Sequence, residues 1–288
     1  MEVEYSSKYF PKKLRNIKNF PQKIYVLGNI EIINNFGIAI IGSRSCSTYG
    51  EKMAKLFAQR LSKYKINIIS GMARGVDKYA HLATIENKGS TIAVLPSGFN
   101  KIYPKENEYI VNKILDAGGA VISEYEPDEM VKSKNFIERN RIVSALSDGI
   151  LIIEGGYRSG TAVTARIAKE QNKKIFCVPS SLENPKGLVP NKLIHEGAAL
   201  VRNEEDIIEN FDNIEKRKSE EYEKINFSNI NESFIMDFLE DEIGIDEIVK
   251  KSNLKIEEVN YQLTMLQLMN KIEQLPGKRY RRIVWEII

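Results

Sequence analysis

Histidine, cysteine and long apolar runs are scarce in this chain, and each shortage excludes a class of protein. The 288 residues include two histidines and two cysteines, and Cys46 and Cys177 lie far apart, without the CxxC spacing of a zinc site. We therefore expect no metal, no disulfide and reduced, intracellular cysteines. No apolar stretch approaches the roughly 20 residues that cross a bilayer, and the first residues lack a signal-peptide pattern. We expect a cytoplasmic protein that does not associate with membranes.

Excess charge is lacking as well. The 42 lysines and arginines outnumber the 39 aspartates and glutamates, so the net charge is only +3. A nucleic-acid partner is neither required nor excluded by this value, and it would have to be held by local positive charge. The apolar fraction of 42% is ordinary for a globular protein, and the length suffices for one large and one small domain.

What the chain does contain is an alternation of short apolar runs and amphipathic stretches. The runs occupy 37–42, 66–70, 91–96, 120–125, 149–155, 174–179 and 198–201. They are apolar on both faces, which is typical of parallel strands covered by helices on both sides. Stretches of helical period, such as 49–64 and 161–172, lie between them. The pattern predicts an α/β domain with a doubly wound, mostly parallel sheet.

The same reading predicts four parts of the chain. Residues 1–35 form a short extension packed on the core, with 25–29 as an added edge strand, and residues 36–211 form the α/β domain. The charged stretch 212–229 is expected to be a linker. Residues 230–288 contain three helical patterns and a two-stranded wing that turns at Pro276-Gly277, which is the outline of a small winged-helix domain.

Small residues, hydroxyls and arginines follow the predicted strands at their carboxyl ends. They stand at 42–44, 70–75, 96–98, 123–124, 154–156 and 179–181. Ligands of an open α/β sheet bind beyond these strand ends. Glycine lets backbone amides approach an anion, and a helix N-terminus adds positive partial charge. Any one of these loops is explained equally well as a tight turn, but together they predict a phosphate site.

Known nucleotide and catalytic motifs are absent. The first loop, GSRSCSTYG, does not fit GxGxxG, and no acidic residue stands about 20 positions on to bind a ribose. A Walker A loop is missing too. His81 and His195 are the available histidine bases, and neither belongs to a catalytic triad pattern. We expect no cofactor, no catalytic residue and no enzymatic activity.

Two arginines precede the apolar run 149–155, in the segment FIERNRIVSALSD at 136–148. If the segment is helical there, Arg139 and Arg141 lie about 200° apart around the axis, and one binds a ligand while the other braces a loop or a carboxylate. If it is extended, both can face the ligand. We favour one ligand and one brace, with Arg139 as the ligand. Phe136 offers an aromatic face beside them, unless it is buried.

Several motifs together resemble the DNA-processing protein A (DprA, or Smf) family of bacteria. They are IAIIGSRSCSTYG (38–50), SGMARGVDKYAH (70–81), TIAVLPSGFNKIYPKEN (91–107), GGAVISEYEP (118–127), FIERNRIVSALSDGILIIEGGYRSGTAVTARIA (136–168) and NKLIHEGA (191–198). The resemblance implies a Rossmann-like domain that binds single-stranded DNA, acts as a homodimer and delivers the strand to the recombinase RecA in natural transformation and recombination. The DNA-binding positions that it implies here are Ser43, Arg44, Gly71, Arg74, Gly75, Phe136, Arg139, Asn140, Arg141, Ser159, Gly160 and Thr164.

Two other functions remain open. The loop EGGYRSGTAVT is similar to the PGGxGTxxE loop of phosphoribohydrolases of the same fold superfamily, but Thr164 stands where their catalytic glutamate would be. A nucleotide-binding sensor would use the same phosphate loops without chemistry. For the winged helix, Glu257 and Glu258 near the start of the third helix disfavour reading of a DNA groove, so we expect a partner surface or an accessory DNA surface.

Overall fold

The computed structural model describes residues 1–212, 214, 235–236, 238–239, 242–268 and 271–283. The chain divides into two compact units, Met1–Lys216 and Arg217–Ile288. Nearly all of the predicted linker, 212–229, lies outside the described residues. Within the described residues, no helix is long and apolar enough to cross a membrane.

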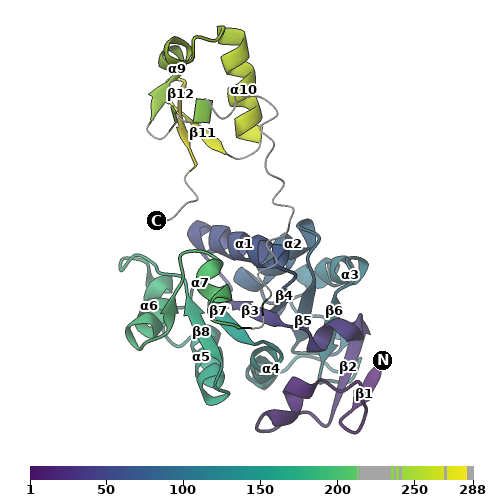
Figure 1. The fold of residues 1–288 in the computed structure, drawn as a ribbon. Coiled ribbons are helices and arrows are strands. Elements are labelled where there is room, and N and C mark those ends of the chain that lie inside the picture. The colour runs from purple at the N-terminus through teal and green to yellow at the C-terminus, as the bar shows by residue number, and fades with distance from the viewer. Residues whose placement is uncertain (213, 215–234, 237, 240–241, 269–270, 284–288) are drawn as a thin grey trace. The chain divides into compact units, whose positions relative to one another are not determined.

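The first unit is built on a nine-stranded sheet in the order β1-β2-β6-β5-β4-β3-β7-β8-β9 (Figure 1). The strands are β1 (Glu2–Glu4), β2 (Lys23–Gly28), β3 (Gly37–Ile41), β4 (Asn67–Ser70), β5 (Thr91–Leu95), β6 (Ala120–Ser123), β7 (Gly149–Ile152), β8 (Lys174–Cys177) and β9 (Ala199–Leu200). From β6 to β9 all neighbours are parallel, and β2 pairs antiparallel with β6 and β1. The predicted doubly wound, mostly parallel sheet is confirmed.

Helices cover both faces of this sheet. They are α1 (Thr48–Lys63), α2 (Val76–Glu86), α3 (Glu108–Asp116), α4 (Ser133–Leu146), α5 (Gly160–Glu170), α6 (Leu188–His195) and α7 (Glu205–Ile208), with the 3-10 turns η1 (Lys12–Asn16), η2 (Ile30–Asn34), η3 (Phe99–Lys101), η4 (Lys105–Asn107) and η5 (Pro185–Gly187). Ile38 and Ile40 pack with α1 and α2, whereas Ala39 and Ile41 pack with α4 and α5. β3 is therefore apolar on both sides, as its sequence indicates.

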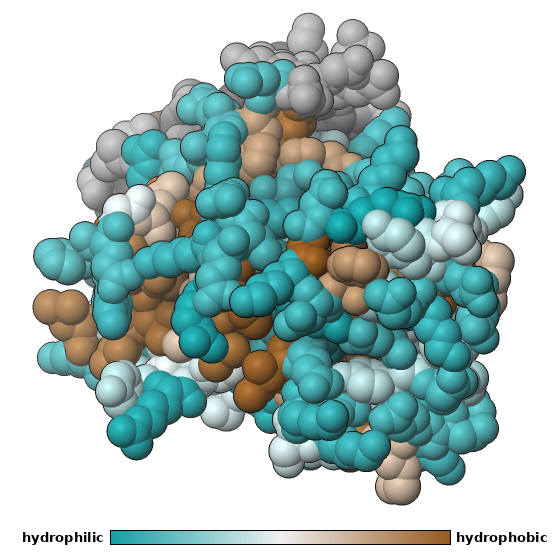
Figure 2. Space-filling view, turned by 90° about the horizontal axis from the view of Figure 1, so that it is seen from below, coloured by the Kyte–Doolittle hydropathy of each residue, from teal (hydrophilic) through white to brown (hydrophobic). Residues whose placement is uncertain are grey.

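The N-terminal segment packs on the α4 face of the sheet. Phe10, Leu14 and Ile17 are buried in the same apolar cluster as Ile142 of α4. The predicted strand at 25–29 is present as β2, but β1 forms the edge of the sheet outside it. Viewed from below Figure 1, the surface is mostly hydrophilic, with separate areas of apolar side chains (Figure 2).

The second unit contains β10 (Ile243–Gly244), α9 (Ile245–Ser252), α10 (Ile256–Leu268), β11 (Ile272–Leu275) and β12 (Arg279–Arg282). Its strands pair in the order β10-β12-β11, and the turn of the wing places Gly277 at φ +81. Ile248, Val259, Leu263 and Tyr280 share a small core. Half of the first predicted helical pattern, 233–242, lies outside the described residues. The described part has the helix and wing arrangement of a winged helix.

The order of the strands also locates a crevice. The chain leaves β3 through α1 toward β4, and it returns through α4 to place β7 on the other side of β3. The loops after β3 and β7 therefore lead away in opposite directions. In open α/β sheets this switch point is where ligands bind.

Candidate functional site

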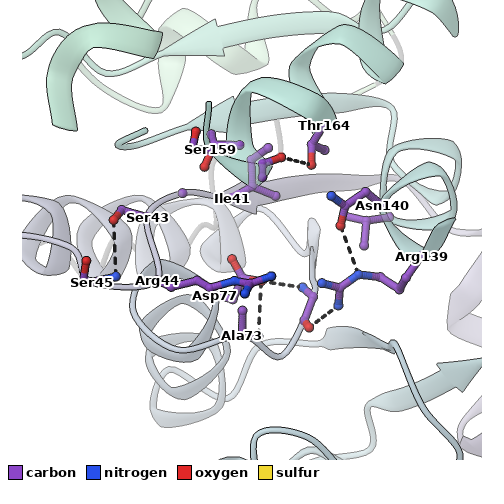
Figure 3. A pocket seen from close by; sticks show the side chains of 15 residues that line it. Ile41, Ser43, Arg44, Ser45, Ala73, Asp77, Arg139, Asn140, Ser159 and Thr164 are labelled. Atoms are coloured by element: carbon purple, nitrogen blue, oxygen red, sulfur yellow. Dashed lines mark hydrogen bonds between the residues drawn. The ribbon is translucent and has the colours of Figure 1, made fainter. Parts of the chain in front are cut away.

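A pocket of about 350 Å3 lies at this switch point (Figure 3). It is lined by residues 41–45 after β3, Gly71 and Ala73 after β4, Asp77 of α2, Arg139, Asn140 and Val143 of α4, and Ser159, Gly160, Thr161 and Thr164 around the start of α5. Figure 3 shows Arg44 and Arg139 directed toward the middle of the pocket from opposite sides. Segments separated by more than 100 residues thus meet around one small volume.

Eight of the sequence-predicted site residues line this pocket: Ser43, Arg44, Gly71, Arg139, Asn140, Ser159, Gly160 and Thr164. Arg74 and Phe136 line an adjoining hollow of about 170 Å3, which also contains Arg44 and Tyr103. Gly75 and Arg141 line neither volume. The structure therefore gathers ten of the twelve predicted residues around two adjacent openings.

Arg44 carries the exposed positive charge of the site. Its guanidinium carbon lies 4.6 Å from the centre of the Phe136 ring, and the half-buried Phe136 meets Tyr103 edge-on at 5.6 Å between ring centres. Within the part of the chain that the structure describes, the Arg44 side chain makes no hydrogen bond and no ion pair. A cation above an accessible ring offers an anion contact and a stacking face at one place.

Arg139 lies deeper than an arginine that binds a ligand from solvent. It is 4% exposed, and its Nη1 donates to the backbone carbonyls of Gly71 and Val94. Its Nε donates to Oδ1 of Asn140 at 3.2 Å. Burial lowers the pKa of the guanidinium to about 10. Arg139 thus forms part of the pocket wall, and its guanidinium is held there by two backbone carbonyls and by the side chain of Asn140.

Arg141 faces a different part of the molecule, because both arginines lie within α4 and the chain there is helical rather than extended. Its Nη2 donates to both carboxylate oxygens of Glu124, at 2.5 and 2.6 Å. It lines a separate groove between α4, α5 and the N-terminal segment. The two arginines therefore do not meet at one ligand from this helix.

Asp77, near the start of α2, holds the loop after β4. Its Oδ2 accepts hydrogen bonds from the amides of Gly71 and Ala73, at 3.1 and 3.3 Å. Burial raises the pKa of this carboxyl group, while the Arg139 charge and the loop amides lower it. The sequence reasoning missed this role, although an acidic residue directly after a glycine loop is a usable signal.

Gly75 acts through its backbone. Its φ is +68, and a Cβ atom there would lie 2.2 Å from the carbonyl oxygen of Ser43. The amide of Val76 donates to the same oxygen at 3.2 Å. Because only glycine tolerates this approach, Gly75 fixes the loop after β4 against the loop after β3.

The N-terminus of α5 forms another side of the pocket. Ser159 caps the helix by accepting a hydrogen bond from the amide of Ala162 at 3.3 Å. Thr164 is buried and donates to the carbonyl of Gly160 at 3.0 Å. A Cβ at Gly160 would meet nothing within 4 Å, so the backbone here is open to the pocket. The partial positive charge of the helix N-terminus therefore faces the opening.

Glu154 is a second carboxylate whose role the sequence reasoning missed. It is fully buried, and it accepts hydrogen bonds from Ser47 Oγ at 2.5 Å, Ser47 N at 2.8 Å and Asn184 Nδ2 at 3.1 Å. It ties the loops after β3 and β8 to the end of β7. The sequence does carry a signal for this role, because Glu154 is a charged residue near the end of an apolar run.

The pocket lacks an obvious catalytic arrangement. Asp77 is the acidic residue among those that line it, and its carboxylate binds the loop amides. Among the described residues, no cluster of histidine, cysteine or acidic groups could hold a metal ion. His81 is buried, and its Nδ1 lies 2.7 Å from Thr91 Oγ1, while burial lowers its pKa to about 3. The Asp77 carboxylate and the His81 imidazole are thus both engaged in contacts within the fold.

Arg74 is another exposed arginine beside the site, but a carboxylate already engages it. Its Nε and Nη2 donate to the two carboxylate oxygens of Glu106, at 2.6 and 2.9 Å. Both side chains are more than half exposed. An incoming phosphate would therefore compete with Glu106 for Arg74, whereas it would find Arg44 free.

Comparison with known proteins gives the family. Residues 2–212 match the family model of DNA recombination-mediator protein A, and residues 231–278 match that of the DprA winged helix domain. Protein Smf of Escherichia coli (strain K12) is 35% identical over 278 residues, which are 94% of this chain and 74% of that protein. DNA processing protein DprA of Bacillus subtilis (strain 168) is 34% identical over 208 residues, covering 72% and 70%.

Solved structures agree with this assignment. DNA processing protein A of Streptococcus pneumoniae superposes with a TM-score of 0.70 at 33% identity, over 73% of this chain and 74% of that one. DNA processing protein A of Helicobacter pylori, described for its single-stranded DNA-binding mode, has a TM-score of 0.65 at 31% identity, over 73% and 95%. This chain belongs to the DNA recombination-mediator protein A family.

Proposed function

We propose that this protein is not an enzyme and that it binds single-stranded DNA, with the strand passing over the switch-point pocket. The observation that carries the proposal is the exposed Arg44 guanidinium, which lies over the Phe136 ring without any ion pair within the described residues. Single-strand binding combines cations that hold phosphates with aromatic faces on which bases stack. One residue pair at the mouth of the pocket supplies both.

The pocket itself is suited to a phosphate. The open backbone at Gly160 stands at the N-terminus of α5, and the exposed Ser45 and the half-buried Ser43 offer hydroxyl donors on the facing loop. Asp77 lines the pocket, but its carboxylate accepts hydrogen bonds from the loop amides and lies near the Arg139 cation, whereas Glu154 does not line the pocket and is bound by Ser47. The contacts involve the backbone of the nucleic acid, and we therefore expect little dependence on base sequence.

Family membership supports the finer part of the proposal. We infer that the bound strand is protected and passed to a RecA recombinase during DNA uptake and recombination, and that the protein acts as a homodimer. Light scattering would measure the dimer, and RecA filament formation on oligo(dT) with and without the protein would measure the delivery. A monomer, or an unchanged rate of filament formation, would contradict these finer statements alone.

Fluorescence anisotropy tests the central proposal. A labelled oligo(dT) of about 30 nucleotides is titrated with the protein, and unlabelled single strands, duplex and mononucleotide are added as separate competitors. We expect tight binding that only single strands reverse. Displacement by the mononucleotide would favour a nucleotide sensor or a phosphoribohydrolase-like site, and release of free base from the mononucleotide would identify the enzyme.

A further inference from the structure

Tyr157 and Arg158 form a second aromatic and cationic pair, in the loop between β7 and α5. Tyr157 is 74% exposed, and the Arg158 guanidinium carbon lies 5.4 Å from the centre of its ring. Within the described residues neither side chain has a hydrogen bond or an ion pair. The loop thus presents a large aromatic ring and a free cation to solvent.

The place of this pair in the loop sets it beside the switch-point pocket. Ser159 and Gly160, the next two residues, line the pocket. Arg158 has φ +55, a backbone conformation that non-glycine residues seldom adopt. Such strained positions persist where the surrounding structure fixes them, often at binding sites. The exposed position of Tyr157 is therefore built by the same turn that shapes the pocket wall.

Strand order places the two aromatic pairs on opposite sides of the pocket. The sequence of neighbours is β4-β3-β7, and strands lie about 4.8 Å apart, so the ends of β4 and β7 are separated by about 10 Å. The hollow that contains Phe136, Tyr103 and Arg74 adjoins the loop after β4, and Tyr157 follows β7. A strand that crosses the edge of the sheet from one pair to the other passes over the pocket.

Further positive charge is carried by η5, whose backbone contacts the same loop. The amide of Gly155 donates to the carbonyl of Lys186 at 2.6 Å, so η5 lies against this loop. Within the described residues the Lys186 side chain has no ion pair. Glu183 is the exposed carboxylate of the neighbouring loop, while Glu154 is buried and hydrogen-bonded. Two cations against one exposed carboxylate favour a polyanion at this surface.

We propose that Tyr157 and Arg158 form a second contact site for single-stranded DNA, in which a base stacks on Tyr157 and Arg158 binds an adjacent phosphate. The inference rests on the proposed function and extends it, because it gives the strand a path across the edge of the sheet and a minimum length. Stacking tolerates any base, so the second site adds affinity without sequence preference.

Oligonucleotide length separates this site from the pocket. Anisotropy is measured with oligo(dT) of about 4 and about 20 nucleotides. Tyr157→Ala is expected to weaken binding of the long strand about tenfold and to leave the short strand unchanged, because the short strand occupies the Arg44 and Phe136 side alone. Tyr157→Phe keeps the ring and serves as the matched control, with affinity equal to that of the native chain.

A second variant tests the charge of Arg158. Arg158→Asn removes the charge but suits the left-handed backbone, so it tests the cation without disturbing the turn. We expect Arg158→Asn to weaken binding of the long strand several-fold. It should also lower the salt dependence of binding for that strand only. Equal melting temperatures of the variants and the native chain would show that the substitutions leave the fold as a whole intact.

The outcomes are distinct. If the native chain binds neither length, the proposed function and this extension both fail. If the native chain binds both lengths and Tyr157→Ala binds each length as tightly as the native chain does, the proposed second site is wrong and the proposed pocket stands. If Tyr157→Ala loses affinity for both lengths, Tyr157 shapes the pocket and does not form a second site. A change in self-association with unaltered DNA affinity would assign Tyr157 to a protein contact and overturn the proposal.

Discussion

Arg139 of α4 donates a hydrogen bond from its guanidinium to the backbone carbonyl of Gly71, in the loop after β4. A second bond from the same nitrogen reaches Val94 in β5. One buried cation therefore fixes a helix, a strand and a binding loop relative to one another. Arg44, on the facing side of the pocket, has no comparable structural contact. The two arginines contribute to binding in different ways, and this difference can be measured.

Arg139→Ala should destabilise the protein. The change deletes the hydrogen bonds that the buried guanidinium donates, each worth about 1.5–3 kcal/mol. It also leaves the buried carboxylate of Asp77 without the positive charge that lies near it. We expect the free energy of unfolding to fall by about 3 kcal/mol in urea denaturation. This expectation differs from the ligand role that the sequence favours. A fully stable Arg139→Ala variant with weakened DNA binding would restore that role.

Arg44→Ala should weaken DNA binding while leaving the stability of the protein nearly unchanged. Its guanidinium is exposed and supports no described element, so the free energy of unfolding should change by less than about 0.5 kcal/mol. Loss of one phosphate contact should weaken oligo(dT) binding about tenfold and reduce the salt slope by about 0.7. Arg44→Lys is the control, because it keeps the charge and should recover much of the affinity. Unchanged affinity of Arg44→Ala would remove Arg44 from the site.

Glu106→Gln should tighten DNA binding. The carboxylate holds Arg74 by two hydrogen bonds, and an exposed pair of this kind is worth about 0–1 kcal/mol. Freeing Arg74 should therefore raise the affinity for oligo(dT) about threefold at low salt. The control is Glu106→Gln in an Arg74→Ala background, where the gain should vanish. An equal gain in both backgrounds would mean that Glu106 acts through general charge repulsion and not through Arg74.

The pH dependence of stability should reveal His81. Burial lowers its pKa to about 3 in the folded chain, whereas the unfolded chain takes up the proton near pH 6.5. Between these values the unfolded state binds more protons, so stability falls as the pH falls through this window, by about 1.4 kcal/mol per pH unit from this residue. His81→Gln should show a shallower slope in urea denaturation at pH 7 and pH 5. Identical slopes would mean that His81 binds protons equally in the folded and the unfolded chain.

Local patterns in the sequence predicted most of the fold. Buried runs such as 37–41 and 149–152 are apolar on both faces, and this property follows directly from a parallel sheet covered on both sides. β1 was not predicted, because three residues reading Glu-Val-Glu carry too little pattern to mark a strand. Its place was fixed by pairing with β2, a contact across about 20 residues of chain.

The site was less accessible from sequence because its chemistry depends on tertiary placement. Glycine loops and strand ends indicated where Ser43 and Gly71 would gather, since carboxyl ends of parallel strands share an edge. The engagement of the Arg139 guanidinium by backbone carbonyls, and of Glu154 by Ser47, required distant segments to be positioned first. The exposure of Tyr157 likewise depends on a turn that no local propensity specifies.

The salt dependence of oligo(dT) affinity tests the central claim most directly. Anisotropy titrations across a range of salt concentrations give the slope of log K against log salt. If four to six phosphates are neutralised per bound strand, the slope should be about −3 to −4 for the native chain and less steep for Arg44→Ala. A slope near zero, or one that Arg44→Ala leaves unchanged, would contradict a phosphate-binding site at the switch-point pocket.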